Sequence, residues 1–188
     1  MKNQKKQFLN NKEMKNLVVV ITFLMTSSIS FAQGAFDKFE DKEEVTSVVV
    51  NKKMFEMMSK VKVDAKDKEM QQYMNLLKKL DNLKVFTTNN IKISSDMKAT
   101  VNSYLKSNPL EELMRVNNDG KTVKIYVKSG ANENIVKELL MFIEGANVKG
   151  AETVILSLTG NFNLDEISML TEKMKLPGGD DLKKASKK

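Results

Sequence analysis

The chain has 188 residues and a formal net charge of +7, and it contains neither cysteine nor histidine. Without these side chains, disulfides, Cys/His zinc sites and the Ser-His-Asp triad are excluded. With a single arginine and no tryptophan, the chain is poorly supplied for base readout, so we expect no nucleic-acid partner and no cofactor.

The chain begins with a pattern typical of a secretory signal. Residues 17–34 read LVVVITFLMTSSISFAQG, and the apolar part is much shorter than the roughly 20 residues of a membrane span. A lysine-rich start and the small-residue site ending in Ala32 predict a signal peptide over residues 1–32, cleaved between Ala32 and Gln33. Translation from Met1 or from Met14 yields the same mature chain. Removing five lysines and one glutamate lowers the net charge to +3.

We therefore expect an exported, soluble protein without a transmembrane span, located in the periplasm or outside the cell. The mature chain divides into one α+β domain over residues 33–176 and a lysine-rich, disordered tail over residues 177–188. No cysteine follows the apolar run, so lipid anchoring is excluded.

The first half of the domain predicts helices alternating with strands. The expected elements are a short helix or ordered arm (33–44), a buried strand (45–50), a helix capped by Asn51 (51–61), a helix with an apolar face from Met70 to Leu80 (64–80), a strand (82–89) and a helix capped by Ser95 and ended by Pro109 (94–109).

The second half predicts a hairpin followed by strands and a last helix. Two extended runs flank a turn at Asn117–Gly120, and a clear strand (152–162) precedes a helix (163–174) capped by Asn163. The run 134–145 fits a helix or a buried strand. On the second hairpin strand, alternation places Lys124, Tyr126 and Lys128 on one face, which is our candidate contact surface.

The segments LEELMRV, VKIYVKSG, VKELLMFIEG and ETVILSLTGNFNLDEISMLTEKM, in this order, resemble the DUF4252 family. That family comprises small envelope or secreted proteins of Bacteroidota, many of them lipoproteins, without an assigned activity. The resemblance implies a strand at 138–144 and an α+β fold. In that fold a largely antiparallel sheet of about six strands, with the serial strands from 110 to 160 as a meander, has helices packed on one face and a C-terminal helix. This chain departs from the lipoprotein members because Ala32 and Gln33 stand at the cleavage site without a cysteine.

Several patterns that carry chemistry in other proteins have simpler explanations here. Two Ser-x-x-Lys pairs lack the partner motifs of penicillin-binding enzymes. The acidic segment 37–44 and the Asn117–Gly120 turn lack the glycine or closing glutamate of calcium loops. The methionines that raise copper binding coincide with apolar helix faces, so we expect them in the core: Met54, Met57, Met58, Met70 and Met74.

These observations favour an exported, non-catalytic binding or interaction module of the bacterial cell envelope, whose partner is an envelope protein or polymer. One alternative is a small envelope hydrolase that uses two carboxylates across a cleft. Another is a peripheral membrane or surface-polymer binder that acts through the lysine tail.

Overall fold

The computed structural model describes residues 34–64, 66–118, 120–132, 134–145 and 152–179. The chain divides into two compact units, Met1–Ala35 and Phe36–Lys188. The predicted signal peptide and its cleavage site at Ala32 and Gln33 lie outside the described residues. The architecture below is that of the second unit.

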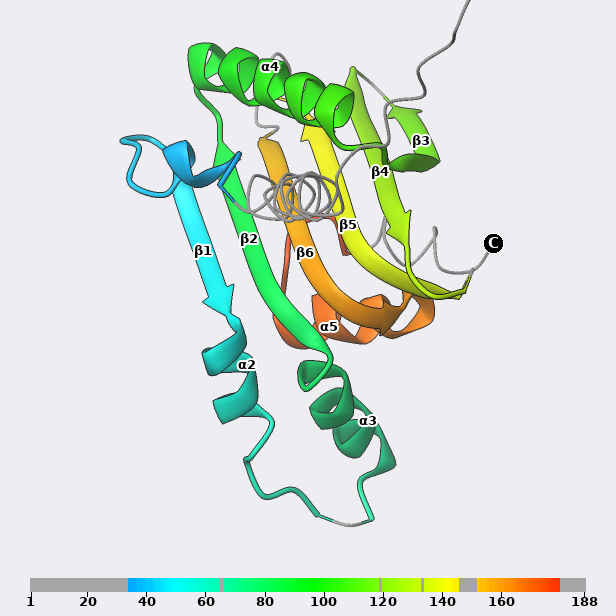
Figure 1. Ribbon diagram of the computed structural model, residues 1–188. Coiled ribbons are helices and arrows are strands. Elements are labelled where there is room, and N and C mark those ends of the chain that lie inside the picture. Colours follow the sequence, from blue (N-terminus) through cyan, green and yellow to red (C-terminus); the bar gives the residue numbers. More distant parts are fainter. Residues whose placement is uncertain (1–33, 65, 119, 133, 146–151, 180–188) are drawn as a thin grey trace, which may run out of the picture. The chain divides into compact units, whose positions relative to one another are not determined.

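Six strands form one antiparallel sheet in the order β1-β2-β6-β5-β4-β3 (Figure 1). The predicted α+β class, the six strands and the meander from β3 to β6 are confirmed. The elements are η2 (Asp37–Phe39), β1 (Thr46–Asn51), α2 (Lys52–Met58), α3 (Lys68–Leu77), β2 (Leu80–Thr88), α4 (Ile91–Ser107), β3 (Glu111–Asn118), β4 (Lys121–Ser129), β5 (Ile135–Glu144), β6 (Thr153–Asn163), η3 (Leu164–Glu166) and α5 (Ile167–Lys173).

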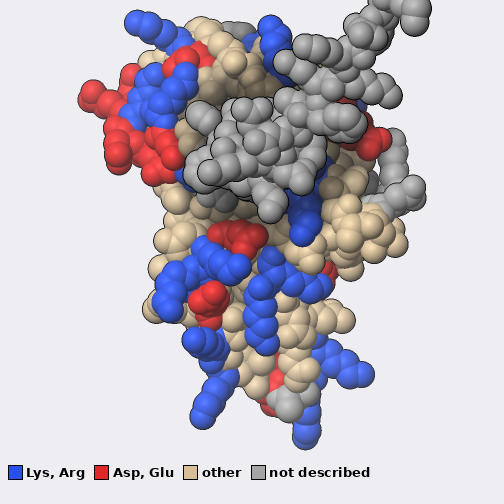
Figure 2. All heavy atoms as spheres, in the orientation of Figure 1, with Lys and Arg blue, Asp and Glu red and all other residues tan. Residues whose placement is uncertain are grey.

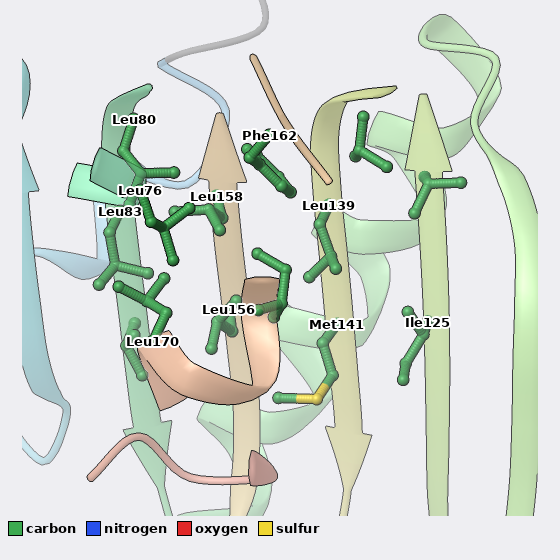
Figure 3. Packing of buried hydrophobic residues seen from close by; sticks show 14 of the residues in the cluster. Leu76, Leu80, Leu83, Ile125, Leu139, Met141, Leu156, Leu158, Phe162 and Leu170 are labelled. Atoms are coloured by element: carbon green, nitrogen blue, oxygen red, sulfur yellow. The ribbon is translucent and has the colours of Figure 1, made fainter. Parts of the chain in front are cut away.

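The main hydrophobic core lies between one face of this sheet and helices α3 and α5. Alternate residues of the strands point to this face, because side chains of a strand alternate between its two sides. Figure 3 shows how these side chains pack together with Leu76 of α3 and Leu170 of α5. The labelled strand residues are Leu80, Leu83, Ile125, Leu139, Met141, Leu156, Leu158 and Phe162.

Helix α4 lies on the opposite face of the sheet, in contrast to the expectation that all helices share one face. The Ser94 and Thr153 hydroxyls are 2.6 Å apart, and Lys98 Nζ donates to Glu144 Oε1 at 2.6 Å. Thr153 precedes the core residue Val154, and Glu144 follows the core residue Ile143. The side chains of Thr153 and Glu144 therefore point away from the core. Helix α4 connects β2 to the far edge strand β3, so it has to cross β6, β5 and β4, and it crosses them on the face that α3 and α5 do not cover.

The N-terminal cap of α4 is Asn90, and the prediction that Ser95 caps this helix is wrong. Asn90 Oδ1 accepts hydrogen bonds from the backbone N–H groups of Lys92 and Ile93. The Ser95 hydroxyl instead donates to the Ile91 carbonyl at 3.0 Å, inside the helix. The sequence contains two polar candidates five residues apart, Asn90 and Ser95, and the earlier one satisfies two of the unpaired N–H groups of the first turn.

Strand β1 is present as predicted, but it is not buried. It lies at the edge of the sheet with β2 as its neighbour, and only Val50 is buried. The β-branched sequence indicates a strand without revealing how many strands flank it. The ambiguous run 134–145 is strand β5, whose residues Glu138–Ile143 are all buried because the sheet is covered on both faces there.

Residues 36–44 lie over the α4 face as an ordered arm with one short 3₁₀ turn. Phe36 packs on Tyr104 and Phe39 on Phe86, with ring centroids 5.1 and 5.9 Å apart. Lys84, buried on β2, donates to the carboxylates of Asp37 and Glu40. Burial opposes the charged amine, but the hydrogen bonds to these two carboxylates raise the pKa of Lys84 overall.

Gly160 of β6 lies opposite Leu80 of β2, where the register of the two strands shifts between Leu80 and Asn82. A Cβ atom on Gly160 would lie 2.4 Å from the Lys79 carbonyl oxygen. The same carbonyl accepts a hydrogen bond from the Asn161 N–H at 2.8 Å. Glycine is therefore required here by close approach of two backbones.

The C-terminal end of the described chain packs on the sheet. Gly178 has a positive φ of 76°, and a Cβ atom on it would meet Met141 Cε at 2.5 Å. Residues 180–188, most of the predicted disordered tail, lie outside the described residues, so the domain boundary at 176/177 stays a prediction.

Candidate interaction surface

The predicted contact residues Lys124, Tyr126 and Lys128 share one face of β4, as their alternation indicates. Their neighbours Val123, Ile125 and Val127 point into the core. Lys128 is exposed, Lys124 is half-buried, and the tyrosine side chain is only 9 % exposed. The face thus offers two basic groups around a largely buried aromatic ring.

Two residues of the neighbouring strand β3 complete this surface. Glu112 lies opposite Tyr126, and Arg115 lies opposite Lys124. Residues three apart in a regular strand point to opposite faces. A bulge between Glu112 and Met114 changes this parity, and it places the glutamate and the arginine on the same face.

The guanidinium of Arg115 is held in a two-pronged ion pair. Nε donates to Glu112 Oε1 at 2.9 Å, and Nη2 donates to Oε2 at 2.7 Å. Tyr126, opposite Glu112 in the sheet, also contributes to lowering the pKa of this carboxyl group. The arginine is the main reason that the pKa of Glu112 is lowered, whereas burial is the main reason that the pKa of Tyr126 is raised. We call Glu112, Arg115, Lys124, Tyr126 and Lys128 the β3–β4 surface.

A buried acid lies next to this surface. Glu138 is paired with Lys128 in the sheet register, and it accepts a hydrogen bond of 2.5 Å from the hydroxyl of Tyr104 on α4. Burial raises the pKa of Glu138 against the opposing effects of Tyr104 and Lys128. The neighbouring Thr159 hydroxyl on β6 is buried without a hydrogen-bond partner among the described residues. The hydrogen bond between Tyr104 and Glu138 fixes the C-terminal half of α4 to the sheet.

The Ser95/Lys98 pair borders a surface hollow of about 320 Å³ but is not arranged for nucleophilic chemistry. The serine donates its proton to the Ile91 carbonyl, and the lysine ammonium is bound by Glu144. A nucleophilic serine requires a base within hydrogen-bond reach. The other Ser-x-x-Lys pair, Ser103/Lys106, lies exposed on the same helix.

Neither of two hollows on the described part of the chain brings two carboxylates together. The hollow at Ser95 contains one carboxylate, Glu144, and a second hollow of about 490 Å³ also contains one, Glu152. The arm residues Asp37 and Glu40 are bound to Lys84. Within the described ranges, no group of three or more acidic side chains is placed to hold a metal ion.

The methionine prediction is correct for three residues and wrong for two. Met58, Met70 and Met74 pack against the core. Met54 and Met57 are 48 % and 57 % exposed, because α2 turns Phe55 and Met58 inward. The apolar spacing of this short helix does not show which of its sides faces the sheet.

The chain was compared with protein families, curated proteins and solved structures. A family model described as a domain of unknown function, DUF4252, matches residues 39–170. Neither the curated proteins nor the solved structures contain a match. Among the described residues no helix is long and apolar enough to cross a membrane.

Proposed function

Since the chain belongs to the DUF4252 family, for which no activity is described, we propose that it is an exported, non-catalytic interaction module of the bacterial cell envelope. The signal-like residues 1–32 support export, and the absence of cysteine at their end supports a soluble protein that is not lipid-anchored. Recovery of the protein from the producing cell with Gln33 as its N-terminus tests this. An intact Met1 or Met14 in the cytoplasm would overturn it.

The observation that carries the interaction role is the β3–β4 surface. Three cations and one carboxylate surround the ring of Tyr126, so the surface carries a net positive charge. The two-pronged pair with Glu112 holds Arg115 in one orientation before any partner binds, which lowers the entropic cost of binding. Arginine and tyrosine are enriched where protein interfaces gain most of their affinity. We infer that the partner presents anionic groups.

The test uses the tagged full chain, expressed in the producing cell and retrieved with the envelope fraction bound to it. Arg115→Ala and Lys128→Glu are expected to lower the retained material about tenfold, equivalent to about 1.4 kcal/mol. Rising salt should release the wild-type complex, since exposed ion pairs are screened. The control variant Lys62→Glu makes the same charge change as Lys128→Glu, at an exposed site outside the β3–β4 surface. Equal retention by all variants would refute the role of the β3–β4 surface.

A further inference from the structure

The two edges of the sheet differ in how they are protected. At one edge, β3 carries the charged residues Glu111, Glu112 and Arg115 and a bulge. Charges and bulges of this kind prevent edge strands from pairing with other chains. At the other edge, β1 reads TSVVVN, pairs with β2 over six residues without a register shift, and contains no charge. Figure 1 shows this strand at the outer side of the sheet, continuing directly into α2.

The exposed valines of β1 lie on both faces of the sheet. Val48 is 41 % exposed and lies beside Val85, which points into the core, whereas Val49 is 44 % exposed and lies beside Lys84 on the α4 face. A helix packed on one face would cover only one of them. A strand added alongside β1 covers both, and it also pairs the outward backbone groups.

The charges at the two ends of β1 are opposite. Asp41, Glu43 and Glu44 precede the strand, and Lys52 and Lys53 follow it. In Figure 2 acidic side chains gather around the segment before β1, whereas lysines dominate the α2–α3 end. An antiparallel copy of the same strand brings the acidic end of each protomer to the basic end of the other.

From these three observations we propose that two copies of this chain associate through antiparallel pairing of their β1 strands, which creates one continuous twelve-stranded sheet with a two-fold axis at its centre. Outward backbone groups occur at every second residue, so paired positions must sum to an even number. The register centred on Val48 satisfies this rule. It places Val48 beside Val48 of the second copy and Ser47 beside Val49, and it brings the acidic segment before each β1 strand toward the lysines at the start of α2 in the other copy.

The first test compares the same substitution at the two sheet edges. Val48→Lys places a charge at the centre of the proposed interface, and Leu113→Lys places one on the outer strand β3, where the leucine is 38 % exposed. Sedimentation equilibrium should give twice the protomer mass for the wild type and for Leu113→Lys, and a single protomer mass for Val48→Lys. A wild-type monomer, or dimers that persist in Val48→Lys, would overturn the proposal. Unchanged circular dichroism confirms that the variants are folded.

The second test uses the opposite charges at the ends of β1. Glu43→Lys alone weakens the acidic end of each β1 strand, and Lys53→Glu alone weakens the basic end. Each variant should therefore form a weaker homodimer than the wild type at the same salt concentration. A mixed dimer joins the intact acidic end of one variant to the intact basic end of the other, so it should form in preference to either homodimer. Homodimers that form as readily as the mixed dimer would refute the antiparallel arrangement.

The proposed dimer and the proposed envelope partner use different parts of the sheet. The β3–β4 surface lies at the opposite edge from β1. Val48→Lys should thus abolish dimers while the protein still retains envelope material, and Lys128→Glu should do the reverse. Loss of one property therefore leaves the other measurable.

Discussion

Replacing Gly160 with alanine is expected to destabilise the protein. The φ angle of Gly160 lies outside the positive range, so alanine is compatible with its backbone conformation. At such positions the exchange normally stabilises a protein by about 0.4–1 kcal/mol, since it restricts the unfolded chain. Here the added methyl group would lie 2.4 Å from the Lys79 carbonyl oxygen, 3.0 Å from Leu80 Cα and 3.2 Å from Phe162 Cδ1. Two of these atoms belong to the backbone of the neighbouring chain segment and cannot rotate away.

The magnitude follows from what the methyl group displaces. Overpacking of a core typically costs about 1–3 kcal/mol. Moving the Lys79 carbonyl also weakens its hydrogen bond from the Asn161 N–H, which contributes about 0.5–1.5 kcal/mol. After subtracting the gain in the unfolded state, the free energy of unfolding should fall by about 0.5–4 kcal/mol. For a domain of this size, Tm then falls by at least roughly 1 °C.

Urea and thermal unfolding followed by circular dichroism measure this change. Gly179→Ala provides the matched control, because its Cβ would meet no atom closer than 3.3 Å, at a side chain of Thr171. We expect the control to change stability by less than about 1 kcal/mol. A Gly160→Ala variant with unchanged or increased stability would show that the β2–β6 contact is looser than the structure indicates.

Two further predictions concern α4. Asn90→Ala should cost about 1 kcal/mol of stability through loss of two cap hydrogen bonds, whereas Ser95→Ala should change little; equal effects in denaturant titrations would contradict the cap assignment. Glu138→Gln should alter the pH dependence of unfolding, because the pKa of Glu138 is raised in the folded state and the folded protein therefore binds its proton more tightly than the unfolded chain. Wild-type stability should fall as pH rises from the ordinary glutamate pKa toward the raised one, and a variant with the same slope would refute the burial of this acid.

The sequence is sufficient to locate most strands and helices, because their signals are local. The Asn51 cap, the hairpin before Lys121 and the alternation of β4 are all contained in a few adjacent residues. The edge position of β1 and the path of α4 across the sheet have no such local signal in the sequence. They depend on which strands become neighbours, and the insertion of β6 between β2 and β5 is not visible in any local pattern.

The candidate surface is predictable in the same limited way. Alternation places Lys124, Tyr126 and Lys128 together, because they belong to one strand. Their partners Glu112 and Arg115 are three residues apart on another strand, where regular spacing would separate them. Only the register of the hairpin and its bulge bring all five side chains together.

The position of β6 has a consequence for the order in which the fold can form. It is the last strand of the chain and pairs with both β2 and β5 near the middle of the sheet. Until residue 153 and those beyond it are available, β1–β2 and β3–β4–β5 share no strand pairing. Closing the sheet requires contacts between strands about seventy residues apart, and contacts of such long range slow folding. A chain synthesised from its N-terminus therefore holds two groups of strands with no strand pairing between them until β6 has been made.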